Sequence, residues 1–450
     1  MKRIGDILTR YKEAETVKDE VTYKQVTIGT NYKGVRLRGT KKGIEIGTKN
    51  QWLVKAGQFI LSRIDARNSA FGIIPDNLEG ALVTNDFMAY EVNEDEVERG
   101  FFNVFLQSPV FLDACIKASR GNTNRKRVDE DFFLNFEVNL PPLPEQHDLI
   151  KKINKSRASV EIAQQEITHQ ETLLTKLKQA ILQEAISGKL TAEWRAAHPD
   201  VEPASQLLKR IQVEKARLIA AKKLRKEKLL PKITAAEIPF EIPGGWEWCR
   251  LGEAIRLMNG GSFESGDFRK GEGVKCIKIT NAGVSEFVET DDTLPIGFAK
   301  SYAKYQVFSG DLILALTRPY IATGLKISRC PDSYNGALLN QRVAAIRPIE
   351  ELLNSDYAFL FLCSDFVLRG YQAEFDSKGQ QPNLKSEHVT HLRLALPPLS
   401  EQAAIVERVE ALMEHCRALA AEIEHTRTDA AHLLQAVLKE AFAPAARLTQ

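Results

Sequence analysis

The sequence has 450 residues, of which 44% are hydrophobic and 27% are charged, and its formal net charge is +2. This length predicts two or three domains with ordinary globular cores, and the near-zero net charge means that an attraction for polyanions can come only from local basic patches. The six cysteines form no CxxC pair, which argues against a zinc ribbon or a disulfide framework, and the lack of a leader-like start or of a run of about 18 apolar residues predicts a cytoplasmic protein.

Residues 1–139 are predicted to form a first domain that mixes strands and helices. Short apolar runs, such as residues 59–62 and 86–92, lie between turn residues, which is typical of strands. A helical pattern interrupts them over about residues 97 to 118.

A long helix is predicted within residues 140–188. The segment Leu140-Pro-Pro-Leu-Pro-Glu-Gln146 precedes it, and proline is tolerated only near the first turn of a helix. Gly188 suits the end of the helix. Apolar residues recur every seven positions, a pattern typical of a coiled-coil seam: Ile153, Val160, Ile167, Leu174 and Ile181. From residue 149 to 186 such a helix would be roughly 57 Å long.

Residues 189–245 are predicted to hold a basic helix and a linker. The helical pattern over residues 205–230 carries nine Lys or Arg against two Glu and stops before Pro231. Residues 235–245 contain Pro239, Pro243 and two consecutive glycines, as linkers do. The local excess of seven positive charges gives this helix an attraction for polyanions.

Residues 246–395 repeat the style of the first domain as a second domain, residues 396–443 repeat the long helix, and residues 444–450 form a tail. The segment Leu396-Pro-Pro-Leu-Ser-Glu-Gln402 returns 256 positions after the first copy. The second heptad series contains Val409, Leu412, Cys416, Leu419, Ile423, Ala430, Leu433 and Val437. Matching lengths and registers favour pairing of the two helices with each other; the alternative is that each packs on a separate core.

Basic residues alternate with amides and aromatic residues in the predicted loops of both domains. Arg and Lys neutralise phosphates and bond to guanine, while Asn and Gln bond to adenine. One such cluster alone is more often a solvated surface, but both domains carry one beside a comparable glycine, Gly121 or Gly379. The predicted DNA-binding residues are Lys33, Arg36, Arg38, Lys41, Lys42, Arg63, Arg67, Asn68, Arg120, Asn122, Asn124, Arg125 and Lys126 in the first domain, and Asn259, Phe263, Arg269, Lys270, Lys278, Asn281, Arg318, Tyr320, Lys378, Gln380, Gln381 and Asn383 in the second.

Motifs for catalysis or metal binding are missing. The sequence lacks the amino-methyltransferase signature, a GxxxxGK[ST] phosphate loop, HExxH and GxSxG. The glycine-rich stretch at residues 260–266 lacks a lysine and suits a flexible loop, and His388 and His391 have no carboxylate partner in the pattern. We therefore predict a binding protein with no catalytic and no metal-ligating residues.

Four motifs resemble the specificity subunit of type I restriction–modification systems. They are the two Leu-Pro-Pro-Leu-x-Glu-Gln boxes, the segment Ser187-Gly-Lys-Leu-Thr191 with Trp194, and Pro243-Gly-Gly-Trp-Glu-Trp248 followed by Leu251, Gly252 and Glu253. The double box with its fixed spacing is specific, and the resemblance covers nearly the whole chain. The turn from Gly379 to Asn383 also looks like the family pattern, which the first domain departs from at Arg125.

The resemblance implies an α+β protein: two similar target-recognition domains of mixed α/β fold, each reading one part of a split DNA sequence, joined by two long helices that form an antiparallel coiled coil. It implies as partners two modification subunits that bind S-adenosylmethionine and methylate adenine, and restriction subunits that translocate and cut DNA, with ATP and Mg²⁺ in the partners and no cofactor in this chain. The alternatives are a stand-alone DNA methyltransferase or nuclease, and a coiled-coil scaffold that does not bind DNA.

Overall fold

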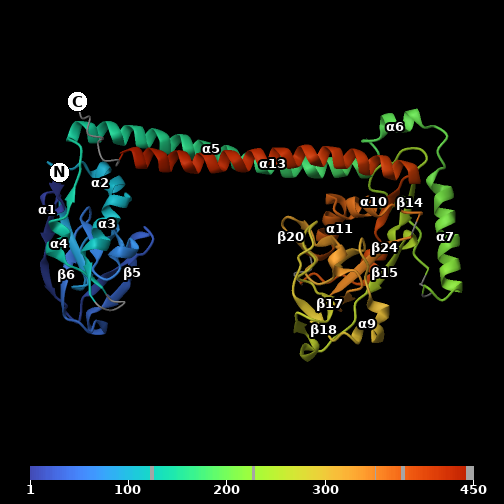
Figure 1. Ribbon diagram of the computed structural model, residues 1–450, viewed down its shortest axis with the longest axis horizontal. Coiled ribbons are helices and arrows are strands. Elements are labelled where there is room, and N and C mark those ends of the chain that lie inside the picture. Colours follow the sequence, from blue (N-terminus) through green and yellow to red (C-terminus); the bar gives the residue numbers. More distant parts are fainter. Residues whose placement is uncertain (122–125, 225–228, 350, 377–380, 442–450) are drawn as a thin grey trace. The chain divides into compact units, whose positions relative to one another are not determined.

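The computed structural model describes residues 1–121, 126–224, 229–349, 351–376 and 381–441, with only the backbone described for residues 434, 435 and 437–441. The chain divides into two compact units (Figure 1): unit 1 comprises Met1–Thr168 and the chain from Glu424 onward, and unit 2 comprises His169–Ile423. Each unit contains a mixed α/β domain and one part of each of two long helices, α5 (Leu143–Ile186) and α13 (Leu399–Ala441). Among the described residues, no helix is long and apolar enough to cross a membrane.

The domain of unit 1 contains a four-stranded sheet in the order β2-β10-β7-β8 and a five-stranded sheet in the order β3-β6-β9-β4-β5. Its strands are β1 (Lys2–Arg3), β2 (Leu8–Tyr11), β3 (Glu13–Thr16), β4 (Thr22–Gly29), β5 (Gly34–Lys42), β6 (Asn50–Val54), β7 (Phe59–Ser62), β8 (Phe71–Ile73), β9 (Ala81–Val83), β10 (Phe87–Val92), β11 (Ser119–Arg120), β12 (Arg127–Val128) and β13 (Glu137–Val138). Its helices are α1 (Ile4–Ile7), α2 (Arg99–Phe105), α3 (Pro109–Ala118) and α4 (Glu130–Leu134), with the short 3-10 turns η1 (Gly43–Glu45), η2 (Ala66–Asn68) and η3 (Asp76–Leu78).

Buried aromatic rings hold the core of unit 1 together. Phe59 from β7 meets Phe111 from α3 edge to face, with 5.6 Å between the ring centroids, and both side chains are fully buried. The helical pattern around residues 97–118 is two helices, because Ser108 accepts a hydrogen bond from the Phe111 N–H and Pro109 takes the first helical position of α3.

The domain of unit 2 contains one four-stranded sheet in the order β15-β24-β19-β22 and another in the order β16-β18-β17-β23. Its strands are β14 (Glu247–Arg250), β15 (Ile255–Asn259), β16 (Arg269–Lys270), β17 (Val274–Ile277), β18 (Asp292–Leu294), β19 (Leu312–Ala315), β20 (Tyr320–Ile321), β21 (Gly324–Leu325), β22 (Ile327–Arg329), β23 (Leu338–Leu339), β24 (Val343–Pro348) and β25 (Arg393–Leu396). Its helices are α6 (Ala192–Ala197), α7 (Ala204–Ala220), α8 (Leu251–Ala254), α9 (Phe298–Ser301), α10 (Ser355–Leu362), α11 (Asp365–Phe375) and α12 (Ser386–Thr390), with the 3-10 turns η4 (Ala235–Glu237), η5 (Ser265–Asp267), η6 (Ala303–Tyr305) and η7 (Asp332–Tyr334).

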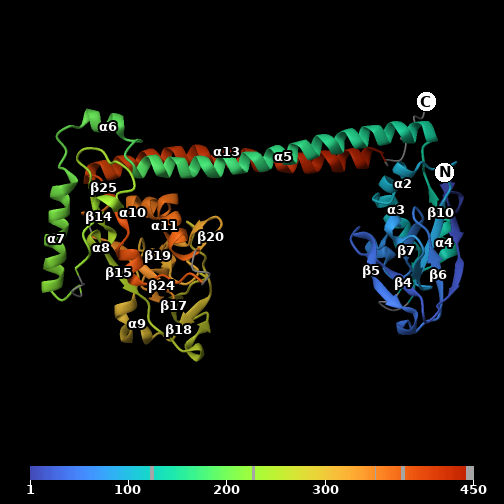
Figure 2. The same cartoon turned by 180° about the vertical axis from the view of Figure 1, so that it is seen from behind.

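The two domains share a four-stranded antiparallel sheet and the pairing of their first strand with their last. The antiparallel sheet β2-β10-β7-β8 of unit 1 corresponds strand by strand to β15-β24-β19-β22 of unit 2. Each domain also closes with a two-stranded pair, β1 with β13 and β14 with β25. Figure 2 shows β7 and β10 of unit 1 and β15, β19 and β24 of unit 2 from the side opposite to Figure 1. The prediction of two similar mixed α/β domains is confirmed.

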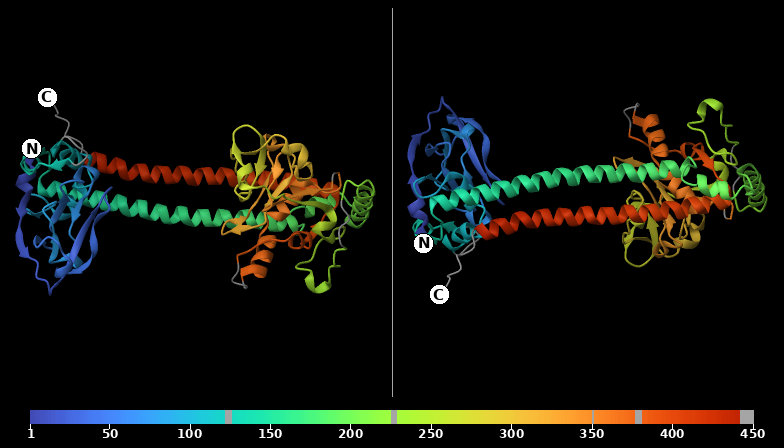
Figure 3. Two further views of the ribbon diagram at one scale, coloured as in Figure 1. Left: turned by 90° about the horizontal axis from the view of Figure 1, so that it is seen from below. Right: turned by 90° about the horizontal axis from the view of Figure 1, so that it is seen from above.

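The two long helices form an antiparallel coiled coil. In unit 2 the C-terminal part of α5 and the N-terminal part of α13 share one core, to which Ile181 and Val409 belong. In unit 1 the opposite ends of the same helices lie side by side (Figure 3). The residues of the first heptad position are buried or half-buried: Ile153, Val160, Ile167, Leu174 and Ile181 in α5, and Val409, Cys416, Ile423 and Ala430 in α13.

The second apolar position of each heptad in α13, which holds Leu412, Leu419 and Leu433, is less buried than a coiled-coil seam predicts. Leu412 is half-buried, but Leu419 is 50% exposed and Leu433 is 48% exposed. The partner helix therefore covers these two leucines only in part, in contrast to the residues of the first heptad position. The side chain of Val437 lies outside the described residues.

The basic helix α7 is shorter than the pattern suggests and belongs to unit 2. It ends at Ala220, since Lys222 adopts a left-handed backbone (φ 59°) and the Lys223 and Leu224 N–H groups both donate to the Leu218 carbonyl. Leu207 and Ile211 are buried in the core of unit 2, so α7 is docked on the second domain rather than standing outside it.

Candidate nucleic-acid interface

In unit 1 the end of β7 is bridged to two other segments by main-chain hydrogen bonds. The Arg63 N–H donates to the Asp86 carbonyl, with 2.7 Å between the atoms, and the Arg63 carbonyl accepts from the Val128 N–H at 2.8 Å. Asp86 precedes β10, and Val128 ends the β11–β12 hairpin that carries Arg120. The predicted residues Arg63, Arg120 and Lys126 therefore come from segments that meet at one end of the sheet.

The β4–β5 hairpin reaches the same end from the other side. At its tip the Asn31 N–H donates to the Asn68 carbonyl at 2.8 Å, and the Tyr32 ring packs edge-on against Phe71 with 5.8 Å between centroids. This contact brings Lys33 at the tip close to Arg67 and Asn68 of η2. Arg36 and Arg38 are exposed along β5.

Lys41 and Lys42 do not join this group. They pair with Tyr23 and Thr22 in the β4–β5 ladder, which places them at the opposite end of the hairpin from Asn31. Both lysines are exposed. They belong to the same hairpin but lie apart from the residues at the end of β7, such as Arg63 and Asn68.

The arginines at this end of the sheet differ in the partners of their side chains. Arg127, a basic residue that the predicted set lacked although its cluster ends on it, pairs with the Asp86 carboxylate at 3.0 Å. The Arg120 guanidinium lies over the Phe132 ring, 4.4 Å from its centroid. The Nε of Arg63 is buried and has no hydrogen-bond partner among the described residues, which leaves one donor of this side chain unused.

Unit 2 repeats the junction at the end of β19. The Leu316 N–H donates to the Arg342 carbonyl at 2.9 Å, the Leu384 N–H donates to the Leu316 carbonyl at 2.7 Å, and the Arg318 N–H donates to the Pro382 carbonyl at 3.0 Å. Asn383 forms a bridge with Thr317. The predicted residues Arg318, Gln381 and Asn383 are thus brought together.

Asn259 and Tyr320 lie beside this junction. Asn259 ends β15 opposite Ala344 of β24, so it occupies the same end of the sheet. The Tyr320 hydroxyl donates to the Asp376 carboxylate at 2.7 Å, and desolvation together with this carboxylate raises the pKa of Tyr320 to about 12. The phenol is therefore a fixed, neutral hydrogen-bonding group.

Two predicted residues of the second domain are structural instead. Asn281 is fully buried; its side chain accepts from the Lys278 N–H and donates to the Val288 carbonyl, so it holds its own turn together. Phe263 is 9% exposed and packs with Cys276 and Leu338 in a small core. Their assignment to DNA contact was wrong, because neither side chain presents a free polar edge or an exposed ring.

The other predicted DNA-binding cations that the structure describes in the second domain lie in or directly after strands of its other sheet, β16-β18-β17-β23. Arg269 and Lys270 are exposed on β16, an edge strand of the sheet β16-β18-β17-β23. Lys278 forms an ion pair with Asp292 at 2.7 Å and lowers the pKa of that carboxyl group. Five further predicted residues lie outside the described residues: Asn122, Asn124, Arg125, Lys378 and Gln380.

The sequence boxes before the long helices act as anchors. Gln146 accepts from the Glu98 N–H at 2.9 Å, and its counterpart Gln402 accepts from the Asn354 N–H at 2.8 Å. Both glutamines are fully buried. The boxes therefore fix each long helix to its own domain through equivalent bonds.

The glutamates of the boxes differ. The Glu401 carboxylate is fully buried, accepts from the Thr191 hydroxyl at 2.7 Å and from the Trp246 indole at 2.8 Å, and pairs with Arg195. Its counterpart Glu145 is exposed. The motif segments around Thr191 and Trp246 thus close over the second box only.

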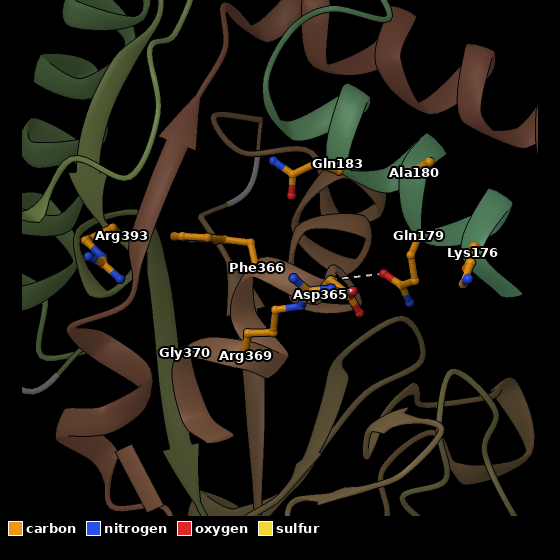
Figure 4. Close-up of a pocket in the computed structure, with 9 residues that line it drawn as sticks. All are labelled: Lys176, Gln179, Ala180, Gln183, Asp365, Phe366, Arg369, Gly370 and Arg393. Carbon is orange, nitrogen blue, oxygen red and sulfur yellow. Dashed lines mark hydrogen bonds and ion pairs between the residues drawn. The ribbon is translucent and has the colours of Figure 1, made fainter. Parts of the chain in front are cut away.

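A hollow of about 620 Å³ lies in unit 2 between α5, α11 and β25. Figure 4 shows Gln179 of α5 facing Asp365 of α11, and its side-chain oxygen accepts from the Asp365 N–H at 3.0 Å. Arg369 pairs with the Asp365 carboxylate at 2.9 Å, and Arg393 lies 5.5 Å from the centroid of the Phe366 ring. These contacts tie α11 to the long helix and to β25.

Candidate metal ligands form no cluster in the described part of the chain. No group of three or more His, Cys, Asp or Glu side chains there could hold a metal ion. Burial raises the pKa of the Cys276 and Cys330 thiols to about 12, so both remain protonated at neutral pH.

Comparison with known proteins identifies a family. The model of the type I restriction modification DNA specificity domain matches residues 1–170 and 243–426. The EcoAI type I restriction enzyme specificity subunit of Escherichia coli is 30% identical over 391 residues, which covers 77% of this chain and 65% of that protein, just under two thirds of its length. The EcoEI specificity subunit of the same organism is 26% identical, over 98% of this chain and 82% of that protein.

Solved structures agree in fold. A chain described under the complex assembly and conformational transition of the type I R-M system has a TM-score of 0.60 at 17% identity and covers 98% of this chain and 96% of its own. The HsdS subunit from Thermoanaerobacter tengcongensis has a TM-score of 0.53 at 16% identity, over 98% of this chain and 95% of that chain.

Proposed function

This chain belongs to the type I restriction–modification DNA specificity family, and from that premise we propose that it reads an asymmetric DNA sequence split into two parts and directs partner subunits to it. Each domain would read one part, and the two long helices would set the spacing between the parts. The chain itself would supply recognition and no catalysis.

The observation that carries the proposal is the convergence of basic and amide side chains at one end of the same sheet in both domains. In unit 1 these are Arg63, Asn68 and Arg120, and in unit 2 they are Arg318 and Asn383. Guanidinium and amide groups are the side chains that read guanine and adenine in the major groove. Because the equivalent side chains differ between the units, the two half-sites would differ as well.

The partners we propose are two modification subunits, which would bind S-adenosylmethionine, and restriction subunits, which would use ATP and Mg²⁺. Exposed apolar side chains on the long helices support a protein partner: Leu173 is 49%, Leu177 44% and Leu419 50% exposed. Leu173 and Leu177 are four residues apart and so share one face of α5, and neighbouring exposed apolar side chains are typical of interaction surfaces.

A footprint on DNA tests the proposal. The complex of this chain with its modification subunits should protect two patches of a duplex, separated by an unprotected spacer. Affinity should fall steeply as salt is added. The logarithm of the binding constant should fall with the logarithm of the salt concentration, with a slope of about −0.9 for each phosphate contacted. A single continuous patch, or binding without sequence preference, contradicts the proposal. The absence of any salt-dependent affinity for DNA favours the protein scaffold.

Two further measurements separate the alternatives. Exchanging residues 1–139 for the corresponding domain of another family member should change only one half of the recognised sequence. Methyl transfer or DNA cleavage by this purified chain alone, with S-adenosylmethionine or Mg²⁺, contradicts a purely recognising role.

A further inference from the structure

The junctions at the ends of β7 and β19 have the same pattern of main-chain hydrogen bonds. Arg63 bonds through its backbone to Asp86 and Val128, and Leu316 bonds in the same way to Arg342 and Leu384. Asp86 and Arg342 each precede the equivalent strand, β10 or β24, and lie 256 positions apart. These two residues therefore occupy the same place in the two domains while carrying opposite charges.

Opposite charge at equivalent places distinguishes base reading from phosphate binding. The phosphate backbone is the same in every half-site, so a position that only neutralised phosphates would favour a cation in both domains. A position that faces base edges has no such constraint, since carboxylates accept from cytosine while arginine donates to guanine. The change from Asp86 to Arg342 is the pattern that base reading produces.

Arg342 is free to reach a ligand. Its side chain is exposed, and among the residues that the structure describes it has no ion-pair or hydrogen-bond partner. Asp86, in contrast, is paired with Arg127. The backbone of Arg342 is fixed at the junction through its carbonyl group, so the side chain starts from a defined position, as base recognition requires.

Arg318 supports the same end of the sheet. It has a left-handed backbone, with φ of 50°, a conformation that is strained for arginine and that clusters at functional sites. The Arg318 side chain is exposed and likewise has no ion-pair partner in the described part of the chain. Among the described residues, two guanidinium groups without an ion-pair partner thus lie next to the adjacent ends of β19 and β24, beside Asn383.

We propose that Arg342, with Arg318 beside it, reads a guanine in the half-site bound by unit 2, and that the Asp86–Arg127 pair takes the corresponding place in unit 1. This inference rests on the proposed function and adds a base-reading residue that the sequence pattern did not single out. Arginine bonds to the O6 and N7 atoms of guanine with two parallel N–H donors.

Sequence selection from a pool of duplexes with randomised base pairs tests this assignment. The complex with the modification subunits is used as the wild type and with Arg342→Ala. The variant should lose preference for guanine at one position of one half-site by about 5- to 150-fold, with the other half-site unchanged. Asp86→Ala should alter only the opposite half-site. Lys189→Ala, which removes an exposed cation after α5, is the control and should change neither.

The outcomes separate the inference from the function on which it rests. If Arg342→Ala binds the wild-type sequence with unchanged preference, or weakens every sequence equally with a salt slope smaller by about 0.9, Arg342 does not read a base and the inference is overturned. If the wild-type complex selects no two-part sequence, the proposed function itself fails. Thermal unfolding of each variant identifies a loss of preference that is caused by misfolding, and Arg318→Ala then tests the same position through its second arginine.

Discussion

Replacing Glu401 by alanine should destabilise unit 2 strongly, whereas replacing its counterpart Glu145 should not. The two glutamates hold the same position in the two boxes, but only the Glu401 carboxylate is fully buried. It accepts hydrogen bonds from Thr191 and Trp246 and pairs with Arg195. Glu401→Ala removes the shared acceptor of all three groups; the Thr191 hydroxyl and the Trp246 indole lose it, while Arg195 keeps its bond to the Gly188 carbonyl.

The magnitude follows from the three contacts. Hydrogen bonds to a charged group contribute roughly 1.5–3 kcal/mol each, or about 4.5–9 kcal/mol for three. Arg195 is 23% exposed, so water partly replaces its partner and the loss is smaller than this sum. We therefore use the loss that is typical when a buried pair is broken from one side, about 3–5 kcal/mol. For a unit of this size each kcal/mol shifts Tm by about 2–4 °C, so Tm should fall by roughly 6–20 °C.

Thermal unfolding followed by tryptophan fluorescence measures this shift. Trp194, Trp246 and Trp248 belong to unit 2 and Trp52 to unit 1, so the emission reports mainly on the unit under test. Glu145→Ala is the matched control; it lies in unit 1, so its unfolding is followed by calorimetry, and surface substitutions usually stay within about 0.5 kcal/mol. Equal shifts in the two variants, or a loss below about 1 kcal/mol for Glu401→Ala, would refute the reasoning.

Two further predictions concern pH and docking. The Thr234 N–H and the Arg250 guanidinium lower the pKa of Glu237 to about 2, so the stabilisation is complete above the ordinary pKa of 4.5 and is lost as pH falls toward 2; the difference in unfolding free energy between the wild type and Glu237→Gln should be constant from pH 7 to about 5 and shrink below that. A difference that grows with acid contradicts this sign. Leu177→Lys with Leu419→Lys should weaken binding of the modification subunits, measured by calorimetry, without lowering Tm, because both side chains are half exposed; unchanged affinity would exclude this surface as the docking site.

The sequence predicts the repeated frame well because the frame depends on short-range patterns. The heptad positions from Ile153 to Ile181 are buried or half-buried in the structure, and Gly188 ends α5 with a left-handed backbone, φ 75°. An added Cβ on Gly188 would lie 2.5 Å from Pro243, so the glycine is needed for close approach as well. Such requirements act locally and leave a visible trace in the pattern.

The site was predicted less well because exposure depends on long-range contacts. Asn281 reads in sequence like a polar loop residue, yet it is buried because Val288 and Thr290 fold back over it. Phe263 is covered by Phe298 and Tyr302 from a distant segment. Arg342 was missed because it lies outside the basic clusters of the sequence. The pairing of the strands brings it near Arg318 and Asn383.

The bonds that fix each junction are main-chain bonds, and this would allow one fold to read two sequences, as the proposed function requires. The contacts of Arg63 with Asp86 and Val128, and of Leu316 with Arg342 and Leu384, use only N–H and carbonyl groups. Their geometry does not depend on the side chains, so a leucine can replace an arginine and an arginine can replace an aspartate without moving the strands. Base recognition needs rigid origins for variable side chains, and a duplicated sheet whose ends are held by backbone bonds provides both.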